Sequence, residues 1–431
     1  MFKSKILQNA QWIIVAKIIQ AVIQLAVSTL TARFLGPSNY GLINYASSIV
    51  AFFVPVMQLG FQATLVQEYT ANPQQEGKIL GTSLALNMIT ALACVVGVTS
   101  FAMVANRGEP ITIAVCALYS ISLLSQSIEM LQYWFQAKLL AKYSASAMLG
   151  AYVVVSAYKV YLLATGKSVY WFALSHAIEY GVTGLILLVI YIKHGTQKLA
   201  FSWDIARMMV SRSKHYIFAM LMVVVYNSIA SILLKIMVNE TENGFYTAAV
   251  ACVNVPGFVF GAIIDTARPV VLESRKRSLQ TFEKNVSKVY SLTTWLSLAQ
   301  SVCYTLLAGV IITILYGKAY LPAVPVLRIL VWNTAFSYMG FVRNIWILGE
   351  NKHAVLWKIN LSGALISIIL NVVLIRLWGA CGAAIASVGV QIFTNFVMGF
   401  VLKPIRPNNR LLLKGFNPSL LLEMAKGLKQ T

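Results

Sequence analysis

Long apolar segments, separated by short turns rich in glycine, proline and asparagine, dominate this chain. Each is close to or longer than the roughly 20 mostly apolar residues that an α-helix needs to cross a bilayer. The turns between them include Gly36-Pro37-Ser38-Asn39 and Glu242-Asn243-Gly244. The pattern predicts an all-α integral membrane protein with about 12 transmembrane helices. We expect these helices at 10–33, 42–66, 79–105, 111–137, 145–165, 169–192, 215–238, 245–267, 289–316, 323–348, 355–376 and 380–402.

The composition excludes a soluble protein. Hydrophobic residues make up 58% of the chain and charged residues only 11%, whereas soluble domains carry about 25% charged residues. Such a chain has too few charged groups to cover a globule with a solvated surface.

The charge is strongly positive, with 34 Lys+Arg against 13 Asp+Glu and a formal net charge of +21. If the N-terminus lies inside, 24 of the basic residues fall in inner loops, inner helix ends and the C-terminal tail, and five fall at the outer side. Basic residues concentrate on the cytoplasmic side of membrane proteins. We therefore predict a multi-pass protein with both termini in the cytoplasm, and we attribute most of the net charge to this orientation.

The longest inner loop divides the twelve segments into six and six. A shift of 203 residues places Gly41 on Gly244 and Ser28 on Ser231, which indicates an internal duplication of two repeats with the same orientation. We predict two pseudo-symmetric six-helix bundles around a central cavity. The expected parts are an N-terminal bundle at 1–192, a cytoplasmic linker at 193–214, a C-terminal bundle at 215–402 and a basic cytoplasmic tail at 403–431.

Polar residues recur at helical spacing inside several apolar segments. In the first segment they step by 3, 4, 4 and 3 residues and so share one face: Lys17, Gln20, Gln24, Ser28 and Thr31. The second and fifth segments carry similar stripes, with Asn44 and Ser48 in one and Tyr152, Ser156 and Lys159 in the other. Lipid tails cannot satisfy such groups, so these faces must meet protein or water. A hydrogen bond to a neighbouring helix is the alternative for any single serine or threonine.

Five basic residues fall within the predicted spans. Lys17, Lys159 and Arg343 lie deepest, where a charge costs several kcal/mol unless it is paired or hydrated. Lys235 and Arg328 lie about one turn from the outer surface and could extend to it along their aliphatic stems. The candidate substrate-binding residues of the cavity are Lys17, Gln20, Gln24, Arg33, Lys159, Arg328 and Arg343.

Acids and prolines inside the spans give two further sets of candidates. Glu129, Glu179 and Asp265 are the candidates for ion coupling; His176 and Glu179 form either a proton relay or an ordinary ion pair. Pro55 and the Pro256-Gly257 pair interrupt corresponding helices of the two halves. They could be hinges, or static bends. The hinge candidates are Pro55, Pro256 and Gly257.

Catalytic and cofactor motifs are missing from the sequence. It contains no H-E-x-x-H, no G-x-S-x-G and no paired-carboxylate loop, and its five cysteines form no Cys-x-x-Cys pair. The outer connections are only a few residues long, which leaves no room for a catalytic domain. We therefore expect a protein that is not an enzyme, with no cofactor and no metal, and with transport driven by an ion gradient or the membrane potential.

The segment after the first span resembles a known family. Thr31-Ala-Arg-Phe-Leu-Gly-Pro-Ser-Asn-Tyr-Gly41 is similar to the motif A-R-x-L-G-P-x-x-Y-G of the polysaccharide (O-antigen) flippases of the multidrug/oligosaccharidyl-lipid/polysaccharide (MOP) exporter superfamily. Weaker matches follow in the same order along the chain: Gln58-Leu-Gly-Phe61, Gly244-Phe-Tyr-Thr-Ala-Ala249, Tyr316-Gly-Lys-Ala-Tyr320 and Trp378-Gly-Ala-Cys-Gly-Ala-Ala384.

The resemblance implies a flippase that moves an undecaprenyl-pyrophosphate-linked oligosaccharide across the bacterial inner membrane by alternating access, coupled to an ion. The substrate would be a repeat unit of O-antigen, and so of lipopolysaccharide, or of another surface polysaccharide. The implied partners are this lipid-linked oligosaccharide, membrane lipids, a polysaccharide polymerase and a chain-length regulator, with no nucleic acid. Family cavities tend to be cationic, which fits Lys17, Lys159, Arg328 and Arg343.

Two departures leave alternatives open. Relatives that extrude drugs commonly use an aspartate in the first span, where this chain has Lys17 and no acid, and flippase relatives often carry an acid where this chain has Gln58. The alternatives are a multidrug/cation antiporter of the same superfamily and a non-transporting scaffold of a polysaccharide assembly complex.

Overall fold

The structure is a computed structural model that describes residues 2–195 and 197–420, apart from the side chains of the first 22 residues and of residues 63 and 141. Every element in the described part is a helix. The α-helices are α1 (Phe2–Met57), α2 (Leu65–Ala71), α3 (Glu76–Ala105), α4 (Pro110–Ser120), α5 (Ser122–Glu129), α6 (Gln132–Ala137), α7 (Ala141–Ala164), α8 (Val169–His194), α9 (Trp203–Met237), α10 (Glu240–Asn254), α11 (Gly257–Arg277), α12 (Leu279–Tyr316), α13 (Ala323–Leu330), α14 (Trp332–Gly349), α15 (Leu356–Ile392), α16 (Met398–Val401) and α17 (Arg406–Gly415). A π-helix, η5 (Phe393–Val397), joins α15 to α16, and short 3₁₀ turns join several of the others.

The prediction of an all-α, multi-pass membrane protein is confirmed. Each of the twelve predicted segments falls on helices of the structure. Within the described residues, eight helices are long and apolar enough to cross a membrane, or nine if the bent pair α10 and α11 forms one span. This count is lower than twelve partly because α1 and α15 each include most of two predicted spans.

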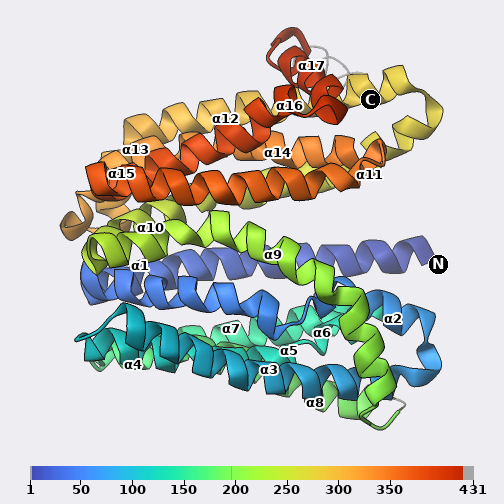
Figure 1. The fold of residues 1–431 in the computed structure, drawn as a ribbon, viewed down its shortest axis with the longest axis vertical. Coiled ribbons are helices and arrows are strands. Elements are labelled where there is room, and N and C mark those ends of the chain that lie inside the picture. The colour runs from blue at the N-terminus through green and yellow to red at the C-terminus, as the bar shows by residue number, and fades with distance from the viewer. Residues whose placement is uncertain (1, 196, 421–431) are drawn as a thin grey trace. The chain divides into compact units, whose positions relative to one another are not determined.

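Both of these long helices are broken at a glycine. In α1 the break is Gly36, with φ of 72°, and in α15 it is Trp378-Gly379, where Gly379 has φ of 52°. Glycine adopts positive φ without the Cβ clash that other residues meet. Pro37 can then start the second part of α1, because the first turn of a helix does not need its N–H. The N-terminal helix therefore runs the length of its bundle and returns alongside (Figure 1).

The chain divides into two compact units, Met1–Val224 and Val225–Thr431. The boundary falls inside α9, C-terminal to the predicted linker 193–214. Most of that linker is helical, because residues 203–214 form the first part of α9. The buried side chains of Ile205 and Met209 there pack with Phe61 in the core of the first unit.

The extended part of the linker, between α8 and α9, is hydrogen-bonded to the start of α3. Gln197 accepts from the backbone N–H of Gly77 through Oε1 at 3.0 Å and donates from Nε2 to the carbonyl of Pro73 at 3.0 Å. The Ala200 N–H donates to the carbonyl of Gly77 at 3.2 Å, and the Ser202 N–H donates to Oγ1 of Thr82 at 3.0 Å. We call residues 197–202 the strap.

Close backbone approach makes the strap possible. A Cβ on Gly77 would lie 2.2 Å from the Lys198 carbonyl oxygen, and one on Gly81 would lie 2.5 Å from that of Ala200. Glycine is required at these two positions because a side chain would clash with the backbone of the strap. The backbone conformation is not the reason, since neither residue has a positive φ.

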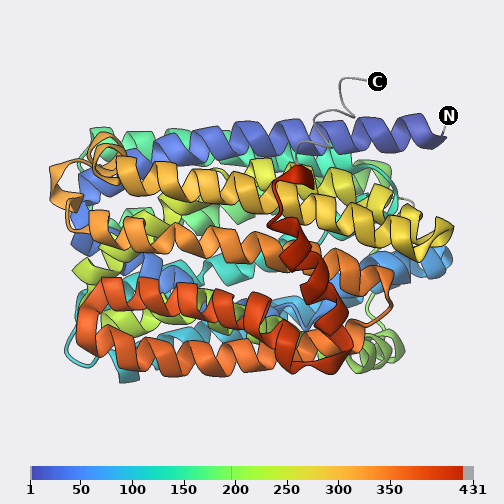
Figure 2. The same ribbon diagram turned by 90° about the horizontal axis from the view of Figure 1, so that it is seen from above.

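The second unit has its own core, which includes Phe282, Trp346 and Leu412. The predicted tail, 403–431, begins with a 3₁₀ turn, Lys403–Ile405, and continues into α17, which packs across α12 (Figure 2). Tyr290 Oη on α12 donates to Oδ1 of Asn408 at 3.0 Å, and Asn409 Nδ2 donates to the carbonyl of Phe396 at 3.0 Å. The last part of the predicted tail, 421–431, lies outside the described residues.

Candidate functional site

A polar cavity of about 380 Å³ lies within the helices of the first unit. Four helical segments line it: the two parts of α1 on either side of Gly36, then α7 and α8. The lining residues are Gln24, Ser28, Thr31, Tyr40, Ile43, Asn44, Ser47, Tyr152, Lys159, Phe172, Ser175, His176, Glu179 and Tyr180.

Helical periodicity explains why these residues converge. On α8 the lining residues follow one face at spacings of three and four: Phe172, Ser175, His176, Glu179 and Tyr180. The break at Gly36 brings the polar face of the first part of α1, with Gln24 and Ser28, to the same cavity as the second part.

The cavity contains ionisable groups of both signs. Lys159 comes from α7, and His176 and Glu179 come from α8. His176 Nδ1 lies 3.8 Å from Glu179 Oε2, and the His176 ring packs against Tyr119 with centroids 5.0 Å apart. The Glu179 side chain is only 17% exposed. A cation and a carboxylate in one partly enclosed space within a membrane-spanning bundle interact more strongly than they would in water.

Amides, hydroxyls and aromatic rings make up the rest of the wall. Asn44 donates from Nδ2 to the carbonyl of Tyr40 at 2.8 Å, which leaves its Oδ1 as an acceptor. Tyr40, Tyr152, Phe172 and Tyr180 contribute rings. Hydrogen-bonding groups placed among aromatic surfaces are typical of small-molecule binding sites.

Three of the predicted site residues meet in this cavity, namely Gln24, Lys159 and Glu179. Lys17 and Gln20 belong to the same helix as Gln24, but their side chains lie outside the described residues. The aromatic lining residues Phe172 and Tyr180 were not among the predicted site residues. They could have been found, because each is four residues from His176 and therefore on its face.

The remaining predicted residues lie elsewhere. Arg33 is exposed near the end of the first part of α1, and Arg328 is exposed on α13. Glu129 is half-buried at the end of α5 and is not among the lining residues. Asp265 is exposed on α11 and pairs with Arg268 at 3.3 Å. An exposed pair one turn apart on a helix is an ordinary surface contact.

Arg343 is buried in the second unit, with 5% of its surface exposed. Its Nη1 donates to the carbonyl of Thr394 at 2.6 Å and its Nη2 donates to Oδ1 of Asn344 at 3.3 Å. Thr394 belongs to the π-helix η5, whose wider turn disturbs the regular backbone hydrogen bonds. A Cβ on Gly340 would lie 2.4 Å from Oδ1 of Asn395, so α14 packs tightly against the same π-helix.

The hinge candidates lie at or near helix breaks. Helices α10 and α11 meet at a bend of 43°, with Pro256 between them and Gly257 as the first residue of α11. Pro55 lies inside α1, close to its end at Met57, and is followed by Leu59 with φ of 50°. Lys235, which was predicted near the outer surface, is buried on α9 with 5% of its surface exposed.

Comparison with known proteins identifies the family. The sequence profile of a family described as polysaccharide biosynthesis protein matches residues 6–274, which is more than half of the chain. The chain belongs to this family. The capsular polysaccharide biosynthesis protein CapF of Staphylococcus aureus is 21% identical over 397 residues, which cover 88% of this chain and 94% of CapF.

Solved structures show the fold of this member of the polysaccharide biosynthesis family. The Lipid II flippase MurJ in an inward closed conformation matches with a TM-score of 0.71 and 15% identity, over 97% of this chain and 92% of that one. An inward-facing multidrug resistance MATE family transporter of the MOP superfamily matches with a TM-score of 0.66 and 15% identity, over 92% and 96%. The match to the polysaccharide biosynthesis family confirms the polysaccharide-family resemblance drawn from the first motif, and the chain shares its fold with MurJ and the MATE family transporter.

Proposed function

We propose that this chain translocates an undecaprenyl-pyrophosphate-linked oligosaccharide, a repeat unit of O-antigen or of another surface polysaccharide, by alternating access. The observation that carries the proposal is a polar cavity that contains Lys159, inside a membrane-spanning unit of a polysaccharide biosynthesis family member. The relative CapF, named for capsular polysaccharide biosynthesis, supports the polysaccharide. The fold of MurJ, named a Lipid II flippase, supports the lipid-linked carrier.

The chemistry of the cavity suits such a substrate. A phosphate or an acidic sugar accepts charge-assisted hydrogen bonds from an ammonium group, which Lys159 provides. Sugar hydroxyls both donate and accept, and they find partners in Gln24, Asn44 and Ser47. The nearby rings of Tyr152 and Phe172 offer apolar surface to the carbon faces of a sugar.

Glu179 supplies a means of proton coupling within this proposal. When ionised, Glu179 compensates the charge of Lys159 in the same cavity. When a proton neutralises Glu179, the positive charge of Lys159 is left for an anionic substrate. Proton binding and substrate binding would then favour each other, which is the reciprocal coupling that a coupled transporter requires. His176, 3.8 Å from Glu179, is placed to pass the proton.

We also propose an orientation and a location for the chain. The distribution of basic residues favours cytoplasmic termini in a bacterial inner membrane. The polysaccharide polymerase and the chain-length regulator, which act on the translocated product, are the proposed protein partners.

A multidrug/cation antiporter is the second candidate. The fold shared with a MATE family transporter, and a carboxylate inside the cavity, favour it. Lys159 in the same cavity disfavours it, because a fixed positive charge repels a cationic drug.

Reconstitution separates the two candidates. Purified protein is placed in proteoliposomes that carry a lipid-linked oligosaccharide with a fluorescent label, and the fraction of label reached by an impermeant quencher is followed. A flippase raises the rate of exchange between leaflets well above that of empty liposomes and does not accumulate cationic dyes. Dye uptake without lipid exchange would favour the antiporter. The absence of both dye uptake and lipid exchange would favour a scaffold.

A further inference from the structure

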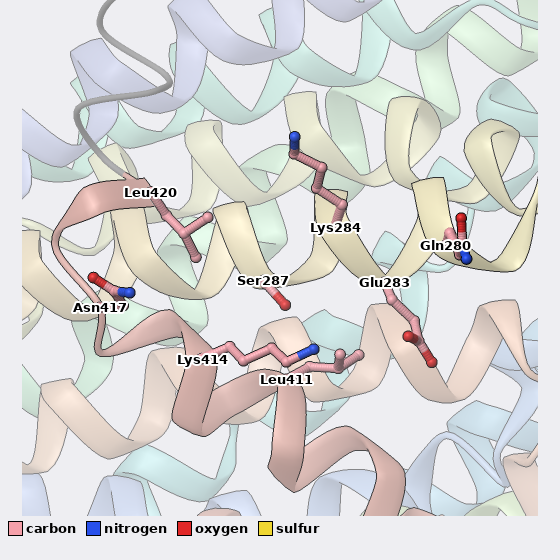
Figure 3. Close-up of a pocket in the computed structure, with 8 residues that line it drawn as sticks. All are labelled: Gln280, Glu283, Lys284, Ser287, Leu411, Lys414, Asn417 and Leu420. Atoms are coloured by element: carbon pink, nitrogen blue, oxygen red, sulfur yellow. The ribbon is translucent and has the colours of Figure 1, made fainter.

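A second pocket, of about 370 Å³, lies in the second unit between the start of α12 and α17. Its polar lining comes from both helices, and two leucines form apolar walls (Figure 3). The lining residues are Gln280, Glu283, Lys284, Ser287, Leu411, Lys414, Asn417 and Leu420.

The length and charge pattern of α12 indicate that the pocket lies near the level of the lipid headgroups. Helix α12 has 38 residues and is therefore about 57 Å long, whereas the hydrocarbon core of a bilayer is about 30 Å thick. Lys288 is the last charged residue before a stretch, 289–316, that contains none. The residues that line the pocket from α12, Gln280 to Ser287, therefore precede the hydrocarbon-spanning part of the helix.

Two oppositely charged side chains face this pocket without being paired. Lys414 extends from α17 beneath Ser287, on the side of the pocket where Glu283 lies, while Lys284 points away from α17 (Figure 3). Neither the ammonium group of Lys414 nor the carboxylate of Glu283 has a hydrogen bond or ion pair with another described side chain or backbone group. An isolated cation would suit any anion, but a cation and a carboxylate that line the same pocket suit a group that carries both charges.

Ser287 adds an unused donor. Only 4% of its surface is exposed, and its hydroxyl points into the pocket (Figure 3). Within the described part of the chain this hydroxyl has no hydrogen-bond partner, although buried polar groups nearly always have one. Asn417 accepts from the Ser419 N–H through Oδ1 at 3.0 Å, which leaves its amide nitrogen as a second donor.

We propose that this pocket binds the headgroup of a zwitterionic phospholipid with a primary ammonium group. The phosphate accepts from Lys414 Nζ and Ser287 Oγ, the ammonium group donates to the Glu283 carboxylate, and Leu411 and Leu420 contact the glycerol backbone and the first methylene groups. The volume lies within the range of about 300–1,000 Å³ that is usual for small-ligand sites. A lipid held here would tie α17 to the membrane surface. This assignment does not depend on the transported substrate.

Competition between lipids tests the site. The full chain is exchanged into mixed micelles with equal amounts of phosphatidylethanolamine and phosphatidylcholine, and bound lipids are counted by native mass spectrometry. Phosphatidylcholine has the same phosphate but no ammonium hydrogens, so it cannot donate to Glu283. We expect about a threefold preference for phosphatidylethanolamine, the size of an exposed charge pair.

Variants show whether Glu283 produces the preference. E283Q should abolish it and E283D should retain it, while K414Q and S287A should reduce the binding of both lipids. E273Q is the matched control, because Glu273 is an exposed carboxylate of α11 outside the pocket, where it pairs with Arg277 at 3.2 Å. Unchanged preference in E283Q would overturn the proposal. So would stronger binding of the anionic lipid phosphatidylglycerol than of phosphatidylethanolamine, since that would indicate a general anion surface.

Discussion

Arg212 on α9 donates from Nη1 to Oε1 of Glu68 on α2 at 2.5 Å, across 144 residues of sequence. The Glu68 side chain is 5% exposed, whereas that of Arg212 is 59% exposed. The pair fixes the start of α9 to the first unit next to Gly60, whose Cβ, if present, would lie 2.7 Å from the Ser213 carbonyl oxygen. The helix that leads into the second unit is thus held at its beginning by a buried carboxylate.

Removing Arg212 should cost more stability than removing another arginine of the same helix. R212A leaves the Glu68 carboxylate buried without its charged partner, so we expect a loss of about 2 kcal/mol in the free energy of unfolding. Arg207 is exposed on α9 and R207A is the control, with an expected change near zero. Thermal unfolding of the purified proteins measures the difference, and equal melting temperatures for the two variants would contradict this role of the pair.

The strap should tolerate no side chain at Gly77. A Cβ there would lie 2.2 Å from the Lys198 carbonyl oxygen, so G77A must displace the strap. We expect faster cleavage within the strap, residues 197–202, by added protease and a lower yield of folded protein. G150A in α7 is the control, because nothing lies within 4 Å of the added methyl group. Equal cleavage of the two variants would show that the strap is not held by this contact.

Arg343 should stabilise the second unit through its hydrogen bond to the π-helix. R343A leaves the carbonyl of Thr394 without its donor, and we expect it to lower the free energy of unfolding by about 1–3 kcal/mol. R343K keeps the charge but has a different shape, so an intermediate loss is expected. R328A, at an exposed position of α13, is the control. An R343A protein as stable as the wild type but defective in transport would instead make Arg343 a substrate ligand.

Glu179 should couple transport to a proton gradient. E179Q cannot change its charge, so a pH difference across proteoliposomes should accelerate wild-type lipid exchange and leave the rate of E179Q unchanged. E273Q, which removes an exposed carboxylate of α11, should respond like the wild type. If the gradient accelerates E179Q as much as it does the wild type, another group carries the proton.

Local patterns predicted the parts of this molecule that depend on neighbours in sequence. Apolar runs gave the helices, because a chain in lipid must satisfy its backbone hydrogen bonds internally. Helical spacing placed Gln24, Lys159 and Glu179 on faces that do meet in one cavity. The glycine of the first motif, Gly36, is indeed where α1 breaks.

Contacts between distant segments could not be predicted in this way. The segment 193–214 was predicted to be a polar, basic loop. Its own sequence does not show that its backbone packs closely against Gly77 and Gly81. From the sequence, Arg343 was predicted to be a deep cation that binds a ligand. In the structure it donates to the carbonyl of Thr394, which belongs to the wider turn of the π-helix. From the sequence, Asp265 was predicted to be a carboxylate within a membrane span. In the structure it is exposed on α11 and pairs with Arg268.

The most direct test of the central claim is lipid-linked oligosaccharide exchange by the K159Q variant in proteoliposomes. Without the ammonium group the cavity loses a charge-assisted hydrogen bond to phosphate, and we expect the rate to fall about tenfold or more. K167Q is the matched control, since Lys167 is exposed in the turn between α7 and α8, and it should exchange lipid at the wild-type rate. Wild-type exchange by folded K159Q protein would contradict the account.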